Sequence, residues 1–420
     1  MKKDVGETFC IIPWLQTVVG ETGEFHVCTH ARLESISDTG GECYNIKKKG
    51  DIELVRNSEQ LKKLRREMLA GSRPKMCTPC FELEDCKIQS YRQRMNRKFE
   101  ESISDLKSET ASDGEVPLPF RYLHVRLGNF CNLKCRMCDP ISSHRLMDEL
   151  EPIYSEIDSV QRRLAHLKNP DWFKKKEAWD EIIKYLKYID QIYLVGGEPF
   201  LIKESFEFLR VIIEAGFSQR ITLHYNTNLT FLPKELYQLW PQFKAVYLHV
   251  SIDGYDSINH YIRYPTKWRD LDRNLHVLDE QKARLNCGEI GINTTVQIYN
   301  AFSLVDLFWY LKENFNNIIP YPNLEPVMFR SQLSLQVLTP ELKDVVEIKL
   351  KTFISDYFKK YAQLPPQQFL NRIKQILAYM RAKDSSHLIP EFKKFTEHMD
   401  LARDQSVLDF VPELTALMSV

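Results

Sequence analysis

The chain has 420 residues, 43% of them hydrophobic, and its 57 Lys and Arg residues balance its 57 Asp and Glu residues. This length should form two or three packed units, and a formal net charge of zero excludes a global field that attracts nucleic acid or anionic membranes. No run approaches the ~20 apolar residues of a membrane span, and the amino terminus lacks the apolar stretch of a signal peptide, so we expect a cytoplasmic protein.

The first predicted unit, residues 1–98, holds six of the ten cysteines. Since nothing in the sequence indicates export, disulfides are a poor explanation, and spacings such as Cys77-Thr-Pro-Cys80 are those of ligand pairs. The segment ends in a basic helical stretch, Tyr91 to Lys98. Residues 99–117 are polar and acidic and are predicted to be a linker.

Residues 118–340 alternate short β-rich runs with longer helical runs, which indicates parallel βαβ units of an α/β fold. The predicted strands are Tyr122–Leu127, Gln191–Val195, Arg220–Asn226, Ala245–Ser251, Gly288–Gln297 and about Leu324–Phe329. Because chemistry in parallel barrels sits at the carboxyl ends of the strands, the segments that follow these strands should converge. Residues 341–420 are predicted to be a helical extension. Within it, Asp400 and Arg403 either form a pair on the helix surface, which is favoured, or reach the barrel mouth.

Three cysteines follow the first of these strands within one short loop, Cys131-Asn-Leu-Lys-Cys135-Arg-Met-Cys138. Three thiolates from one loop would leave one iron of a four-iron cluster open to a small molecule. A structural zinc site is the alternative, with His144 or a distant residue as fourth ligand, although the wider step from Cys131 to Cys135 suits a larger cluster.

Gly196-Gly197-Glu198-Pro199 follows the second strand. It is either a strand-to-loop turn, in which glycine supplies a positive φ, or a place where the backbone approaches a ligand and a carboxylate accepts from an ammonium group. Other polar side chains lie on or near the strands and could face a polar substrate: Arg126, Asn293, Thr295, Gln297 and Glu325.

The cysteine loop, the Gly-Gly-Glu sequence, and Ser251-Ile-Asp253-Gly254 followed by His260 and Arg263 resemble the radical S-adenosylmethionine (SAM) superfamily, in its branch with SPASM or twitch auxiliary-cluster domains. The resemblance implies a partial six-stranded (β/α) barrel of the TIM type. It also implies a [4Fe–4S] cluster that binds SAM and cleaves it reductively to a 5′-deoxyadenosyl radical, which takes hydrogen from the substrate.

By the same resemblance, Glu198 binds the SAM amino group, Gly196 and Gly197 contribute backbone contacts, and Arg263 is the partner of the SAM carboxylate. The remaining SAM contacts implied are Ser251, Asp253, Asn226, Asn228 and Met137. Met137 stands where the family usually has an aromatic residue near the adenine, and a polarizable methionine can substitute for it. Capping of the strand end is an alternative for Asn226 and Asn228, and a surface position is the alternative for Arg263.

The amino-terminal cysteines resemble the twitch or SPASM pattern, although those domains normally follow the barrel and here the segment precedes it. The implied ligands of one auxiliary [4Fe–4S] cluster are Cys10, Cys28, Cys77 and Cys80, with Cys86 as an alternate and Cys43 within reach in sequence. A zinc ribbon is the alternative, because the Cys-x-x-Cys spacing suits zinc equally well.

The expected function is therefore hydrogen abstraction from a substrate, with a small sugar-like or amino-acid-like molecule favoured, leading to oxidation, epimerisation or rearrangement. A peptide-modifying enzyme is one alternative, and a zinc-stabilised module that binds RNA or protein without catalysis is another. The resemblance further implies an electron donor such as flavodoxin or ferredoxin, whereas a nucleic-acid partner is not expected. No catalytic acid, base or hydrogen donor can be named from the sequence.

Overall fold

The computed structural model describes residues 6–31, 34–117, 119–154, 170–327 and 330–419. It is an α/β fold whose eight strands have the order β2-β1-β3-β4-β5-β6-β7-β8. The strands are β1 (Gln16–Val19), β2 (Phe25–His26), β3 (Tyr122–Leu127), β4 (Gln191–Gly196), β5 (Thr222–Thr227), β6 (Ala245–Ser251), β7 (Cys287–Val296) and β8 (Asn323–Pro326). Strand β1 pairs antiparallel with β2. The pairs β1–β3, β3–β4, β4–β5 and β7–β8 are parallel.

The α/β class and the six predicted strands are confirmed, with bounds that agree to within a few residues. The last predicted strand was expected to reach Phe329, but β8 ends at Pro326 and residues 328–329 lie outside the described residues. The structure adds β1 and β2, which the sequence analysis did not predict. Because β1 pairs with β3, the cysteine-rich amino-terminal segment contributes to the same sheet as the predicted barrel.

The chain forms two compact units. The first comprises Met1–Phe130, Asp158–Tyr225 and Glu235–Val246, and the second comprises Cys131–Ile157, Asn226–Lys234 and Tyr247–Val420. The helices of the first unit are α1 (Ile12–Leu15), α2 (Asp51–Leu54), α3 (Glu59–Leu69), α4 (Thr78–Asp85), α5 (Tyr91–Lys98), α6 (Glu100–Ser108), α9 (Lys176–Ile183), α10 (Lys203–Glu214) and α11 (Leu236–Leu239).

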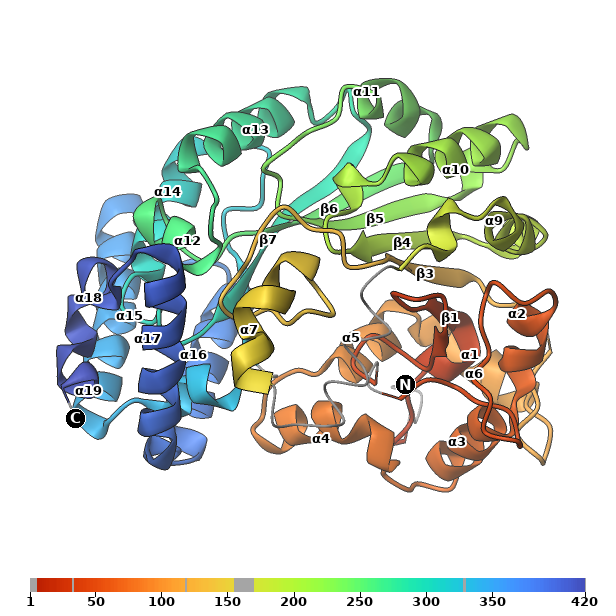
Figure 1. Cartoon of the computed structure of the whole chain (residues 1–420), viewed down its shortest axis with the longest axis horizontal. Coiled ribbons are helices and arrows are strands. Elements are labelled where there is room, and N and C mark those ends of the chain that lie inside the picture. Colours follow the sequence, from red (N-terminus) through yellow and green to blue (C-terminus); the bar gives the residue numbers. More distant parts are fainter. Residues whose placement is uncertain (1–5, 32–33, 118, 155–169, 328–329, 420) are drawn as a thin grey trace. The chain divides into compact units, whose positions relative to one another are not determined.

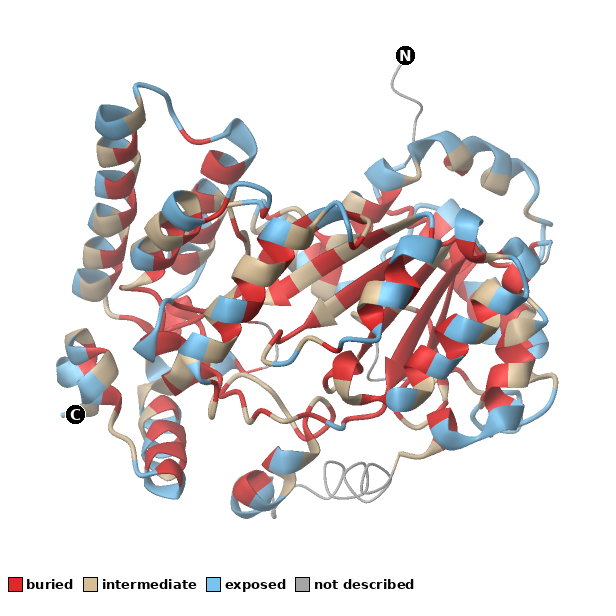
Figure 2. Ribbon diagram, turned by 90° about the horizontal axis from the view of Figure 1, so that it is seen from above, coloured by how far each residue is buried: buried red, intermediate tan, exposed pale blue. Residues whose placement is uncertain are grey.

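In the first unit, β3, β4 and β5 have helices α9 and α10 along one side and helices α1 to α6 on the other (Figure 1). One face of these strands is apolar, with Leu123, Val125, Ile192 and Leu194 all fully buried. Helix α10 is amphipathic and buries Phe206, Leu209 and Ile212, while its outer residues stay exposed, as the alternating colours of the helices in Figure 2 show. Burial of these apolar stripes stabilises the layered arrangement.

Two helices of the amino-terminal segment begin at residues with the local chemistry that helix starts require. Ser58 caps α3 by accepting a hydrogen bond from the Leu61 amide, and Ser90 and Gln93 form a capping box at the start of α5. Residues 99–117, for which a linker is predicted, include helix α6, and its Ile103 is buried. The division into domains stays a prediction.

The second unit holds β7, β8 and most of the long helices. They are α7 (Met147–Tyr154), α12 (Ser257–Ile262), α13 (Trp268–Gln281), α14 (Leu304–Asn314), α15 (Pro340–Tyr361), α16 (Gln367–Ala382), α17 (Ile389–Arg403), α18 (Val407–Phe410) and α19 (Thr415–Met418). Helix α15 starts with a Thr339 cap and Pro340 in its first turn, where a missing N–H costs nothing. Within the described ranges, no helix has the length and apolar character needed to cross a membrane.

Candidate functional site

The three-cysteine loop is held by backbone hydrogen bonds to the segment after α12. The Lys134 amide donates to the Tyr264 carbonyl at 2.6 Å, and the Arg136 amide donates to the Ile262 carbonyl at 2.8 Å. Cys131 and Cys135 are buried beside Leu133, with Cys138 and Met137 partly buried against them. The Cys135 side chain and burial together raise the pKa of Cys138, so these two thiols lie close together in apolar surroundings.

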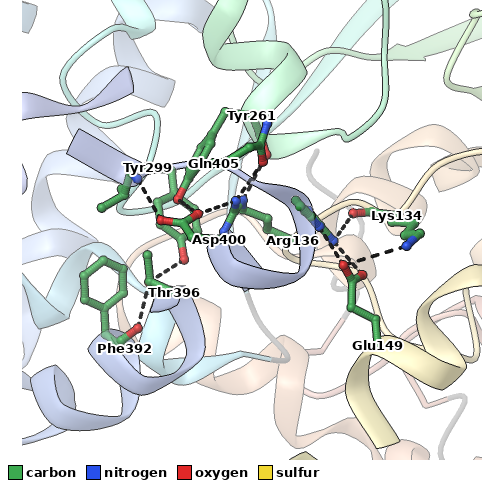
Figure 3. A network of polar contacts seen from close by, with 11 residues as sticks. Lys134, Arg136, Glu149, Tyr261, Tyr299, Phe392, Thr396, Asp400 and Gln405 are labelled. Carbon is green, nitrogen blue, oxygen red and sulfur yellow. Dashed lines mark hydrogen bonds and ion pairs between the residues drawn. The ribbon is translucent and has the colours of Figure 1, made fainter. Parts of the chain in front are cut away.

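Arg136, between the second and third cysteines, is fully buried and lies in a polar network (Figure 3). Its guanidinium donates to Asp400 Oδ1 at 2.6 Å, to Gln405 Oε1 at 3.0 Å and to the Tyr261 carbonyl at 2.9 Å. It also lies 3.7 Å from the ring centroid of Tyr261, a cation–π distance. The loop is thereby fixed to helix α17, far along the sequence.

Two more arginines hold carbonyl groups of the loop. Arg403 forms two hydrogen bonds of 2.9 Å with the Glu149 carboxylate and donates to the Lys134 carbonyl at 2.7 Å. Arg330 donates through Nε to the Cys138 carbonyl at 3.1 Å. The prediction that Asp400 and Arg403 form a surface pair is wrong: both are buried, and each is paired with a residue near the cysteine loop, Asp400 with Arg136 and Arg403 with Glu149.

Arg263 lies between a buried carboxylate and a loop cysteine. Its Nε is 2.7 Å from Asp253 Oδ2, and its Nη1 is 3.7 Å from Cys135 Sγ. Burial opposes the charge of Arg263, but Asp253, Cys135 and Cys138 raise its pKa above the ordinary value, so the guanidinium is charged. The alternative of an exposed surface arginine is wrong, because Arg263 is buried.

Asp253 is fixed from several directions after β6. Its Oδ1 accepts from the Thr295 amide at 2.7 Å, its backbone N–H donates to Asn259 at 3.0 Å, and its carbonyl accepts from Asn300 at 2.8 Å. Burial raises the pKa of Asp253, and Arg263 counteracts this. Asp253 therefore orients Arg263, and Ser251 lies half-buried at the end of β6.

The two asparagines near the end of β5 differ in their surroundings. The Asn228 amide donates to Asn132 Oδ1 at 2.9 Å and lies 3.9 Å from Cys131 Sγ, so it supports the cysteine loop. Asn226 Oδ1 is buried and has no hydrogen-bond partner within the part of the chain that the structure describes. A buried acceptor without a donor is what a bound hydroxyl group can satisfy.

Gly196, Gly197 and Glu198, in the first unit, lie against the residues that lead into the cysteine loop. The Gly197 amide donates to the Gly128 carbonyl at 3.1 Å and the Glu198 amide donates to the Phe130 carbonyl at 2.8 Å. Gly196 has a φ of +145°, and Glu198 is buried, with Oε1 accepting from the Phe200 amide at 3.1 Å. The glycines therefore permit close contact with the chain's own backbone at residues 128–130.

Replacing Gly197 by alanine should destabilise the protein. The new Cβ would overlap the Phe130 carbonyl oxygen and lie 2.7 Å from the Asn129 carbonyl carbon, and backbone atoms cannot rotate away. We expect a loss of about 1–3 kcal/mol in a denaturation experiment, the usual cost of overpacking. Gly291→Ala is the matched control, because its nearest neighbour is 3.8 Å away, and a loss no larger than that of this control would contradict the close approach.

The cysteines predicted to hold an auxiliary cluster lie near one another in the first unit. Burial, with a smaller contribution from Cys80, raises the pKa of Cys28 to about 11. Burial also raises the pKa of Cys10, and Cys28, Cys77 and Cys80 act in the same direction. By contrast, Cys43 is exposed and hydrogen-bonded to Ser37, and Cys86 is half-buried at the end of α4.

The same residues were compared with known proteins. The family model of the Radical SAM superfamily matches residues 125–293, a range that includes the cysteine loop, Glu198, Asp253 and Arg263. The chain contains a radical SAM domain. The protein is therefore an enzyme that uses a [4Fe–4S] cluster and SAM. No curated protein matches the sequence.

Among solved structures, anSMEcpe with bound AdoMet and the Kp18Cys peptide is similar, with 17% identity and a TM-score of 0.38 over 64% of this chain and 68% of that chain. Streptococcus suis SuiB bound to its precursor peptide SuiA has 14% identity and a TM-score of 0.38 over 72% of this chain and 63% of that chain. TYW1 with a lysine-pyruvate adduct has 14% identity and a TM-score of 0.28, covering 56% and 71% of the two chains. Similarity at this level says nothing about the substrate of this chain.

The residues present fit the cofactors of the radical SAM domain. Three buried or half-buried thiols share one loop, a charged guanidinium lies beside Cys135, and Asn226 offers a buried acceptor without a partner among the described residues. The predicted zinc alternative required His144 or another residue to join the three thiols. His144 lies beside the loop, and its Nδ1 accepts a hydrogen bond from the Cys131 amide at 3.3 Å.

Proposed function

We propose that the enzyme abstracts hydrogen from a small polar molecule, with Cys131, Cys135 and Cys138 as the three protein ligands of the SAM-binding cluster. The cluster and SAM together supply a 5′-deoxyadenosyl radical, and the chain's residues position both groups. The observation that carries the proposal is the single rigid loop that presents three cysteines beside Arg263, inside the radical SAM domain.

In this proposal Arg263 binds the SAM carboxylate. A guanidinium offers donors in a fixed planar fork. Asp253 lies at its Nε and Cys135 Sγ near its Nη1, so Nη2 is the nitrogen proposed to bind the carboxylate. Glu198 accepts from the SAM amino group, Asn226 and Ser251 face the ribose, and Met137 lies near the adenine. Asn228 is proposed to act through the loop, because its amide is already bonded to Asn132.

The experiment is anaerobic purification with iron, sulfide and zinc analysis, followed by incubation with SAM and a reductant. The proposal expects a brown protein that forms 5′-deoxyadenosine. A colourless protein with stoichiometric zinc and no 5′-deoxyadenosine would overturn it and favour a zinc-stabilised binding module.

We further propose that Cys10, Cys28, Cys77 and Cys80 hold one auxiliary [4Fe–4S] cluster. The pKa values of Cys10, Cys28 and Cys77 are each raised in part by neighbouring cysteines of this set, so the four thiols lie close together. Ligands of one shared cluster must lie close together in this way. Zinc bound by the same four thiols would instead leave a protein with stoichiometric zinc at this site, which metal analysis distinguishes from iron.

Replacing Cys77 and Cys80 together by serine should remove about half of the bound iron, since each four-iron cluster accounts for half of the total. The sulfide content should fall in parallel. Cys43→Ser with Cys86→Ser is the matched control, expected to keep the iron content. Equal iron loss in the control, or none in the Cys77 and Cys80 variant, would place the auxiliary site elsewhere.

A further inference from the structure

The inner strands of the first unit carry a buried face that is polar rather than apolar. Residues that pair across neighbouring strands share a face of the sheet. Gln16 pairs with Tyr122, and His124 pairs with Tyr193. Val18 pairs with His26 on one side and with His124 on the other. Arg126 follows on the same face of β3. We call Gln16, His26, Tyr122, His124, Arg126 and Tyr193 the polar face.

In two side chains of the polar face every polar atom is buried without a hydrogen-bond partner among the described residues, and His26 Nε2 lacks one as well. Within the described ranges, neither ring nitrogen of His124 and neither amide atom of Gln16 has one. His124 is 1% exposed and Gln16 is 4% exposed. A buried polar group without a partner costs about 1–3 kcal/mol, so two such side chains together point to a ligand that completes them.

Tyr91 of helix α5 lies close to Gln16 of the polar face. Its hydroxyl is buried and interacts with the Gln16 amide and the Tyr122 hydroxyl, but neither contact has the geometry of a full hydrogen bond. Burial raises the pKa of Tyr91, and Cys28, Tyr193 and Cys10 raise it further, so Tyr91 lies near both the polar face and the auxiliary cysteines. Its ring stacks on His30, with the ring centroids 5.1 Å apart. The polar face therefore adjoins the proposed auxiliary cluster.

The Arg126 guanidinium and the His26 ring each have a carboxylate neighbour. Arg126 Nε is 2.7 Å from Glu21 Oε1, and His26 Nε2 is 3.4 Å from Glu24 Oε1. Burial lowers the pKa of His124 well below its usual range, and Arg126 and His26 lower it further, so its ring is neutral. The groups that lack partners are thus a neutral imidazole, an amide and a phenol, which match hydroxyl groups of a ligand as donors and acceptors.

We propose that the polar face binds the substrate, and that this substrate is a small uncharged molecule rich in hydroxyl groups. The proposal rests on the proposed function. Near-complete burial suits a ligand that is enclosed whole rather than a long peptide, and the Tyr193 and His124 rings, 4.9 Å apart, offer flat surfaces to its C–H bonds. Gln16 comes from β1, so the amino-terminal segment contributes directly to substrate recognition.

The first test needs no ligand. Gln16→Met and His124→Leu replace unpartnered polar groups by apolar groups of similar size, so each should raise the melting temperature of the anaerobic holoenzyme by about 2–4 °C. Arg126→Met is the contrasting control, expected to lower it, because it removes the counter-charge of the buried Glu21. A lower melting temperature for Gln16→Met and His124→Leu would show that these groups are stabilising structural elements and overturn the proposal.

The second test uses D-glucose, N-acetyl-D-glucosamine and myo-inositol as neutral probes at millimolar concentration, with D-glucose 6-phosphate as the charged control. At least one neutral probe should raise the melting temperature of the wild type, and the rise should be absent in Gln16→Met and His124→Leu. No rise with any neutral probe, a rise that persists in both variants, or a rise with the phosphate alone would overturn the proposal. Wild-type 5′-deoxyadenosine formation without any probe tests the proposed function separately.

Discussion

Replacing Cys135 by alanine should abolish 5′-deoxyadenosine formation from SAM while the protein keeps about half of its iron. Cys135 is the central member of the loop and the cysteine that Arg263 contacts, at 3.7 Å. Two remaining thiolates cannot hold the cluster in place, whereas the proposed auxiliary ligands lie elsewhere in the chain. The measurements are chromatography of the nucleoside product and iron analysis of the same sample.

Cys287→Ala is the matched control for this variant, since Cys287 is also buried and lies outside both sets of proposed ligands. It should keep its iron and its SAM cleavage. Cleavage at the wild-type rate by the Cys135 variant would refute the assignment of the loop. Complete loss of iron would instead show that the two sites do not assemble independently.

Replacing Arg136 by methionine should cost about 3–5 kcal/mol of unfolding free energy, the typical effect of breaking a buried ion pair. Arg136 is fully buried, and its removal leaves Asp400 with the Tyr261 hydroxyl and the Val407 amide but no counter-charge. Methionine keeps the apolar stem, so the effect reports the guanidinium. Anaerobic urea titration measures it, and the iron content of the same variant should fall because the loop loses its anchor to α17.

Arg381→Met is the control, because Arg381 pairs with Asp344 and Glu347 at an exposed position. Its cost should stay below about 1 kcal/mol. Adding Asp400→Asn to Arg136→Met should recover part of the loss, since the amide carries no buried charge. A cost for Arg136→Met no larger than that of the control would show that the network does not anchor the loop.

The strands and the site motifs were predictable because each has a local signal. The run Tyr122 to Leu127 is wholly buried, and such near-continuous β-rich runs between helical segments indicate parallel strands. Three cysteines within eight residues likewise predict a metal or cluster site, and the wider step from Cys131 to Cys135 favours a cluster over zinc. The [4Fe–4S] cluster and SAM were predictable as cofactors because the motifs that indicate them are also short and local.

The residues that hold the loop were not predictable. Arg136 pairs with Asp400, 264 positions later, and Arg330 reaches Cys138 across 192 positions. No periodicity or motif encodes such a pairing, so on sequence alone Asp400 and Arg403 look like any charged pair on a helix. Arg136 lies among other polar residues of the loop, Asn132 and Lys134, so its burial had no local signal in the sequence. Strands β1 and β2 were missed because they have four and two residues, too few for an alternating pattern.

The central claim is that three cysteines hold a cluster whose remaining iron binds SAM. Electron paramagnetic resonance of the reduced Cys77→Ser, Cys80→Ser protein tests it most directly, because that variant should contain the loop cluster alone. We expect a [4Fe–4S] signal whose g values shift when SAM is added, and no such signal when Cys135→Ala is introduced as well. A signal that SAM leaves unchanged, or a protein that holds zinc in place of iron, would contradict the claim.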